Sequence, residues 1–166
     1  MHATLITQRE YDHTTFEHDA EFVEGKIIER PMPTPPHAVL QTFVGHLLIM
    51  AAGRSGFIPM SELRIRTRPD HTRIPDVCLI RGIPPGNVAT EPPYLCIEIL
   101  SPEDSMVELR TKIAEYLAFG VDYVWVIDPE TFTGEIHTQT AIHRVTDGIF
   151  RAGELTVDIN GVPRRA

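Results

Sequence analysis

Apolar and polar residues repeat with two different periods along this chain, and the first segment with a clear pattern has the period of a strand. Residues 21–29 read Glu-Phe-Val-Glu-Gly-Lys-Ile-Ile-Glu, two short half-apolar runs on either side of Glu24-Gly25. Glycine readily supplies the positive φ that a tight hairpin turn needs. The pattern therefore predicts an N-terminal β-hairpin.

A helical period follows after a proline-rich stretch. Thr34 is a suitable N-cap, Pro35 suits the first helical position, and Gly53 is placed to end a helix over residues 37–52. The apolar residues at helical spacing are Leu40, Val44, Leu47, Leu48 and Ala51. We therefore expect one long helix with a single buried face.

Strand-like patterns dominate the middle of the chain. Residues 57–68 alternate apolar with charged side chains and predict one strand with a basic face of Arg64, Arg66 and Arg68. Residues 69–72 predict a turn. The runs 77–80 and 94–100 are almost wholly apolar, as is typical of central strands covered on both faces.

A second helix and three further strands complete the predicted fold. Ser101-Pro-Glu-Asp104 has the form of a capping box, and the helix after it carries Leu109, Ile113 and Leu117 before ending at Gly120. Residues 121–127 predict another buried strand. Residues 135–138 and 142–145 predict antiparallel additions beyond it. The fold class is α/β, a mixed sheet flanked by helices.

Composition narrows the class of protein. A chain of 166 residues with 42% hydrophobic residues suits one domain, which we expect to span 1–166. A cytoplasmic protein is expected, since no apolar run has the length of a membrane span and the N-terminus lacks a signal-peptide layout. Cys78 and Cys96 are expected to be small core residues. The net charge of −8 argues against non-specific coating of nucleic acid but not against a local basic groove.

Two carboxylates interrupt the apolar strands. Asp76 lies in Ile74-Pro-Asp-Val-Cys-Leu-Ile80 and Glu98 in Tyr94-Leu-Cys-Ile-Glu-Ile-Leu100. An unpaired buried carboxylate costs several kcal/mol or gives up its charge, so two in neighbouring strands indicate a shared cation. Oxygen ligands of this kind suit Mg²⁺, with the carbonyl of Ile99 as a further candidate ligand. Without metal, we expect both carboxylates to destabilise the fold.

A lysine on the second helix is the candidate for charge stabilisation. Lys112 and Tyr116 lie one turn apart, beside the apolar edge of that helix, so Lys112 can overhang Glu98. An ammonium there would stabilise negative charge during phosphodiester hydrolysis. The alternative is a lysine that is simply solvated.

The ordered set of motifs resembles the Uma-two type of restriction-endonuclease-like domains in the PD-(D/E)XK nuclease superfamily. The resemblance covers roughly residues 8 to 146. It is carried by Glu21-Phe-Val-Glu-Gly, Pro35-Pro-His37, Ile74-Pro-Asp-Val77, Ile97-Glu-Ile-Leu-Ser-Pro102, Lys112 with Tyr116, and Gly120-Val-Asp-Tyr-Val-Trp-Val-Ile-Asp-Pro129. One departure from the superfamily is that the (D/E)XK triplet reads Glu98-Ile99-Leu100, so the role of the strand lysine passes to the helix.

This resemblance implies a DNA endonuclease that uses Mg²⁺ or Mn²⁺. It implies Asp76 and Glu98 as metal ligands, Lys112 as the charge-stabilising residue, and Glu21 as a further ligand or water-positioning base. The alternative for Glu21 is an exposed hairpin glutamate. Candidates for substrate binding are His37, Tyr116 and Arg64, of which His37 can equally cap or pack and Arg64 can equally belong to a solvated strand face.

A rival interpretation keeps the fold without catalysis. The acidic charge and the lack of an appended DNA-binding domain favour a non-catalytic interaction module, which could form a homodimer. No HExxH or other ligand-like pairing marks the histidines, so no zinc site is expected. The usual nucleotide-binding and serine-hydrolase motifs are not present in the sequence.

Overall fold

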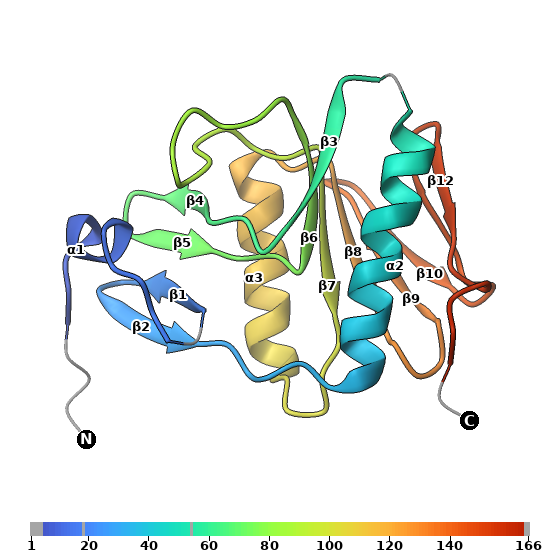
Figure 1. Ribbon diagram of the computed structural model, residues 1–166, viewed down its shortest axis with the longest axis horizontal. Helices are drawn as coiled ribbons and strands as arrows, with labels where there is room; N and C mark the ends of the chain where they lie inside the picture. The colour runs from blue at the N-terminus through green and yellow to red at the C-terminus, as the bar shows by residue number, and fades with distance from the viewer. Residues whose placement is uncertain (1–4, 18, 54, 165–166) are drawn as a thin grey trace.

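A six-stranded mixed sheet forms the centre of the computed structural model, which describes residues 5–17, 19–53 and 55–164 (Figure 1). In spatial order its strands are β10 (Ile142–Val145), β9 (Gly134–His137), β8 (Tyr123–Ile127), β7 (Leu95–Ile99), β6 (Val77–Arg81) and β3 (Phe57–Ser61). Strands β7 and β8 are parallel, and the other neighbours are antiparallel. Because parallel neighbours need a crossover, the helix α3 (Met106–Phe119) joins β7 to β8.

The sheet separates two layers of apolar packing, with α2 (Pro35–Ala52) on one side and α3 on the other (Figure 1). Side chains alternate along β6 and β7. Val77 and Ile97 belong to the core under α2, whereas Cys78 and Cys96 belong to the core under α3. Both cysteines are fully buried and free, which confirms them as small core residues. Among the described residues, none of the helices is long and apolar enough to span a membrane.

A second, smaller sheet lies beside the central one. Its strands, in spatial order, are β2 (Lys26–Glu29), β1 (Ala20–Val23), β5 (His71–Arg73) and β4 (Ile65–Arg68), and the short helix α1 (Gln8–Asp12) lies next to it (Figure 1). The hairpin β1–β2 confirms the predicted one. Its turn residues Glu24 and Gly25 have φ of 50° and 83°, and two positive φ values are the mark of a type I′ turn.

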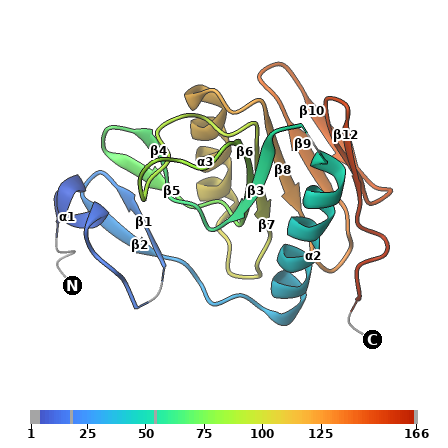
Figure 2. The same ribbon diagram turned by 45° about the horizontal axis from the view of Figure 1, so that its top comes forward.

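A C-terminal hairpin of β11 (Ile149–Ala152) and β12 (Leu155–Asp158) covers the face of the sheet next to α2 (Figures 1 and 2). The indole of Trp125 donates to the carbonyl of Arg151 at 3.1 Å, and the hydroxyl of Tyr94 donates to the carbonyl of Ala152 at the same distance. This hairpin lies beyond the elements predicted from the sequence.

The prediction of one strand over residues 57–68 is wrong. Glu62 has φ of 55°, and the chain breaks there into β3 and β4, which belong to different sheets. A positive φ interrupts an extended backbone, so β4 can leave the central sheet and pair with β5. Within β4 the alternation holds, since Ile65 and Thr67 are buried and Arg68 is exposed. Residues 71 and 72, predicted as a turn, begin β5.

Both long helices form where the sequence indicates, with small differences at their ends and faces. In α2, Ala52 is buried and Ala51 is exposed. The start of α3 differs more, because its N-cap is Ser105, whose hydroxyl accepts from the N–H of Glu108. Ser101 and Asp104 instead close a turn, in which the Ser101 N–H donates to the Asp104 carboxylate at 2.7 Å. Two Ser-x-x-acid signals compete here, and the second starts the helix.

The two serines provide a matched test of this assignment. Ser105→Ala should lower the free energy of unfolding by about 1 kcal/mol, because the helix loses its N-cap acceptor. Ser101→Ala should change it by less than about half of that, because the turn uses the backbone N–H of Ser101. Urea denaturation of both variants measures the difference, and an equal loss would contradict the assignment.

Candidate active site

Strand register brings Asp76 and Glu98 together. Val77 pairs with Ile97 in antiparallel β6 and β7, so Asp76, one residue before β6, comes opposite Glu98. Glu98 contacts Lys112 and Tyr116 of α3, whereas Asp76, at the end of the strand, contacts His37 of α2 and the N–H of Ile99. Asp76 and Glu98 line the same cleft. Asp76 lies at the entrance of β6, not within it as the sequence suggested.

Asp76 is buried but well partnered. One carboxylate oxygen, Oδ2, accepts from the N–H of Ile99 at 2.7 Å and lies 3.3 Å from His37 Nε2, while the guanidinium of Arg30 contacts the other oxygen. Burial acts to raise the pKa of Asp76, but the hydrogen bond from His37 and the charge of Arg30 hold that pKa below its usual value. Asp76 is therefore ionised and paired in the folded protein, unlike the unpaired carboxylate that the sequence suggested. That it destabilises the metal-free fold stays a prediction.

The pKa of Glu98 is shifted in the opposite direction to that of Asp76. Its Oε1 accepts from the hydroxyl of Tyr116 and its Oε2 from Lys112 Nζ, both at 2.9 Å. Burial raises the pKa of Glu98 to about 7; Lys112 opposes this shift, and the charges of Asp76 and Glu21 add to it. Glu98 is thus the carboxylate whose ionisation works against the fold without a further cation.

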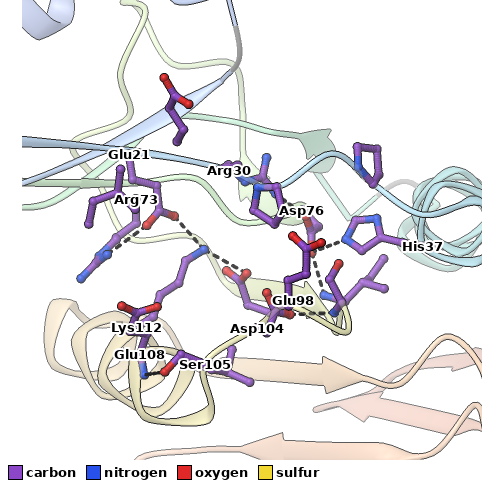
Figure 3. A pocket seen from close by; sticks show the side chains of 18 of the residues that line it. Glu21, Arg30, His37, Arg73, Asp76, Glu98, Asp104, Ser105, Glu108 and Lys112 are labelled. Carbon is purple, nitrogen blue, oxygen red and sulfur yellow. Dashed lines mark hydrogen bonds and ion pairs between the residues drawn. The ribbon is translucent and has the colours of Figure 1, made fainter.

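Lys112 projects from α3 toward β1, β7 and the loop that precedes β6 (Figure 3). Its Nζ lies 2.7 Å from Glu21 Oε1 and donates to Glu98 Oε2 at 2.9 Å and to the carbonyl of Ile74 at 3.3 Å. Although burial acts to lower the pKa of Lys112, the carboxylates of Glu21 and Glu98 raise it overall. The lysine is therefore charged and held in place, which excludes the solvated alternative.

Glu21 is the residue of the β1–β2 hairpin that reaches this group. It is 6% exposed, so it is not the exposed glutamate of the alternative interpretation. Arg73 Nη1 donates to its Oε2 at 2.9 Å, and the N–H of Ile74 donates to its Oε1 at 3.0 Å. Burial would raise the pKa of Glu21, but Lys112 and Arg73 hold it below its usual value. Glu21 is therefore a fixed anionic partner of Lys112.

A cleft of about 700 Å³ opens over these side chains (Figure 3). Its lining includes the predicted residues Glu21, His37, Asp76, Glu98, Ile99 and Lys112. Eight carboxylate side chains line it: Glu21, Glu29, Glu62, Asp76, Glu98, Glu103, Asp104 and Glu108. The Lys and Arg side chains in the lining are three: Arg30, Arg73 and Lys112. The surplus of negative charge favours cations in the cleft.

Two of the predicted substrate-binding residues are not brought to the cleft. Tyr116 is fully buried and lies behind Glu98, to which it donates. Arg64 lies on the face next to α1, where its guanidinium stacks on the ring of Tyr11 at 4.8 Å from the centroid. The third member of the basic face, Arg68, lies 3.7 Å from Asp70. Arg64 and Arg68 are thus engaged with their own neighbours.

Sequence reasoning missed two arginines of the site. Arg30 directly follows the hairpin that carries Glu21, and Arg73 comes three residues before Asp76. Each forms an ion pair with a buried carboxylate, Arg30 with Asp76 and Arg73 with Glu21. Their closeness in sequence to the predicted acids is a weak signal. Only the tertiary fold distinguishes such arginines from surface ones.

The fold and site together define a restriction-endonuclease-like α/β protein, and the comparisons agree. Residues 9–163 match the model of the Uma2 (Uma-two) family, described as "Putative restriction endonuclease". The chain belongs to this family. A similar solved structure is that of "a putative nuclease belonging to DUF820" from Anabaena variabilis ATCC 29413. It is 27% identical, with a TM-score of 0.79 over 93% of this chain and 95% of that one. No curated protein matches the sequence.

The raised pKa of Glu98 gives a stability prediction with a defined sign. Between about pH 4.5 and pH 7 the native state holds a proton on Glu98 that the unfolded chain has released, so stability from this group falls as pH rises. Relative to wild type, Glu98→Gln should therefore gain roughly 2 to 3 kcal/mol between pH 5 and pH 8 in metal-free buffer.

Urea denaturation of both proteins at several pH values measures this difference. Glu103→Gln, at an exposed position on the rim of the same cleft, is the matched control and should show no such trend. A wild-type to Glu98→Gln difference that stays constant with pH would mean that Glu98 is ionised throughout.

Proposed function

We propose that this protein is a metal-dependent endonuclease that hydrolyses phosphodiester bonds of DNA. The proposal rests mainly on one arrangement: the buried Asp76 and Glu98 line one cleft, and the Lys112 ammonium donates to Glu98. Membership of the Uma2 family and the likeness to a nuclease structure support it.

The donor groups fit a hard divalent cation, Mg²⁺ or Mn²⁺. The candidate ligands are carboxylate oxygens of Asp76 and Glu98 and the carbonyl of Ile99, with Glu21 nearby; all are oxygen donors, as Mg²⁺ prefers. The raised pKa of Glu98 supports the fit, because a dication beside it would offset the repulsion from Asp76 and Glu21. When bound, such an ion acidifies a coordinated water and offsets charge on the phosphate.

Lys112 supplies the protein's own positive charge to the reaction. Its ammonium faces the cleft next to the metal ligands, so it can stabilise negative charge that builds up on the scissile phosphate. Glu21 acts as a positioning residue, since it accepts from Arg73 and fixes Lys112 at 2.7 Å. His37 and Arg30, both in contact with Asp76, orient that carboxylate and are candidates to meet a phosphate oxygen at the cleft wall.

The acidic lining of the cleft has a consequence for substrate binding. Eight carboxylates repel a phosphate backbone, so binding of DNA requires that metal ions neutralise part of this charge. We therefore propose that DNA binds poorly without a divalent cation.

We also propose that residues 1–166 act as one domain. A homodimer stays a prediction.

Metal binding should depend on the loss of the proton from Glu98. Because ligands must lose their protons to bind a metal, Mn²⁺ affinity should rise with pH up to about 7, by at most about tenfold per pH unit, and then level off. Isothermal titration calorimetry of the wild type at pH 5.5 to 8.5 measures this. Glu98→Gln should bind weakly at every pH. Equal binding by this variant would place the ion elsewhere.

The two lysines of the chain give a matched test of catalysis. Lys112→Met should lower the rate of Mg²⁺-dependent DNA cleavage by at least about a hundredfold while metal binding survives, because the transition state loses its positive charge. Lys26→Met, exposed on β2, should cleave like the wild type. Gel assays of plasmid cleavage, with thermal melts to confirm folding, measure both.

Two outcomes would count against the proposal. A Lys112→Met variant that folds and cleaves at the wild-type rate would remove Lys112 from catalysis. A wild-type protein that binds neither Mg²⁺ nor Mn²⁺ and cleaves no DNA would favour the non-catalytic interaction module. Metal binding at Asp76 and Glu98 would count against that module, because a protein without catalysis has no reason to keep a metal-competent pair of buried carboxylates.

A further inference from the structure

A second group of ligand-type side chains lies outside the cleft, where two turns of the smaller sheet meet. Glu24 belongs to the β1–β2 turn, Asp70 ends the β4–β5 connection, and His71 is the first residue of β5. One ligand atom from each residue lies within 4.8 Å of the other two, and His71 Nε2 is 3.9 Å from both Glu24 Oε1 and Asp70 Oδ1. Both turns lie on the side of the molecule near α1 (Figure 1).

The imidazole of His71 is the unusual member of this group. His71 is 5% exposed, and its Nε2 is buried with no hydrogen-bond partner among the described residues. A buried polar atom without a partner costs free energy, so it calls for an explanation. This nitrogen is directed toward the two carboxylates at a distance too long for hydrogen bonds. The gap between them is the place that an ion would fill.

Glu115 on α3 supports the other side of the same ring. His71 Nδ1 lies 3.0 Å from Glu115 Oε2, at hydrogen-bonding distance although not aligned as a hydrogen bond. A carboxylate behind one ring nitrogen favours the tautomer with the proton on Nδ1, which leaves the Nε2 lone pair free to bind a metal. This carboxylate–histidine arrangement is a common support of metal sites.

We propose that Glu24, Asp70 and His71 bind a divalent transition-metal ion of the Zn²⁺ type. An imidazole with two carboxylates favours such ions over Mg²⁺, which prefers oxygen ligands alone. Ligand atoms around a tetrahedral ion with bonds of about 2.1 Å lie about 3.4 Å apart, so each distance of 3.9 Å from His71 must contract by about half an ångström. The two carboxylates, which lie within 4.8 Å of each other, must approach by at most about 1.4 Å. Glu24 is exposed and can move that far.

The backbone already holds the two turns together. The N–H of Glu24 donates to the carbonyl of Asp70 at 2.9 Å, and Val23 pairs with His71 across β1 and β5. The competing partner is Arg68, whose Nε lies 3.7 Å from Asp70 Oδ1, but this ion pair is half-exposed and therefore weak. Little rearrangement is needed for the three ligands to close on an ion.

A bound ion would fasten the hairpin that carries Glu21. Glu115, behind His71, also accepts from Arg73 Nη2 at 2.8 Å, and Arg73 donates in turn to Glu21 at 2.9 Å. The ion would therefore hold β1, β2 and β5 in the arrangement that positions Lys112. This site does not depend on the proposed nuclease function, because none of its three ligands lines the cleft.

Zinc binding to the untagged full chain tests the proposal. Equilibrium dialysis with Zn²⁺ in excess Mg²⁺ should give one tightly bound Zn²⁺ per chain. Glu24→Gln and Asp70→Asn, both at surface positions, should weaken this binding at least tenfold. Glu154→Gln, another exposed glutamate in a β-turn, is the matched control and should bind like the wild type. Glu98→Gln should also bind like the wild type, because the cleft is separate.

A spectroscopic readout identifies the ligand nitrogen. On addition of Zn²⁺, the NMR signal of His71 Nε2 should shift in the wild type and stay unchanged in Glu24→Gln, and the melting temperature should rise only where the shift occurs. The proposal is overturned if Zn²⁺ does not bind in excess Mg²⁺, or if Glu24→Gln and Asp70→Asn bind as the wild type does. It is equally overturned if Glu98→Gln alone loses the ion, since the ion would then lie in the cleft.

Discussion

The buried ammonium of Lys112 is the charge on which the arrangement of the site depends. A buried charge costs several kcal/mol unless it is paired and hydrogen-bonded, and Lys112 satisfies this requirement with Glu21, Glu98 and the carbonyl of Ile74. These partners come from the small sheet, from β7 and from the loop before β6. One side chain of α3 thus fixes the positions of both sheets relative to the helix, and the cleft forms where they meet.

The two facing carboxylates differ because their neighbours differ. Asp76 has Arg30, His37 and a backbone N–H, so its charge is stabilised. Burial raises the pKa of Glu98 to about 7, although Lys112, which Glu98 shares with Glu21, opposes this shift. Environments that push the pKa values of paired carboxylates apart are a common property of catalytic sites. The proposed metal site uses this difference, since Asp76 is ready to bind an ion and Glu98 gains its charge when an ion is bound.

The smaller sheet connects the proposed nuclease site with the proposed zinc-type site. Glu115 contacts His71 and Arg73, and Arg73 contacts Glu21, so a continuous set of charged side chains leads from the joined turns to Lys112. The cost of burying these charges is offset only if every member keeps its partner. This explains why Arg73, unremarkable in the sequence, occupies a central place in the structure.

Local patterns in the sequence determined most of the elements and the acidic pair. The turn at Glu24-Gly25, the apolar runs around Asp76 and Glu98, and the helical spacing that places Lys112 near Glu98 depend on nearest neighbours and on periods of 2 and 3.6 residues, which are written in the chain. The family resemblance added the expected order of these parts.

Other features were decided only by tertiary structure, because they depend on contacts between residues far apart in the chain. A positive φ at Glu62 sends β4 into another sheet, so Arg64 turns to Tyr11 and away from the cleft. Arg30 pairs with Asp76, which is 46 residues away in the sequence. Glu24 lies near His71 because the β1–β2 turn meets the start of β5. Periodicity carries no information about such partners, since charge pairing at a distance follows the packing of the sheets.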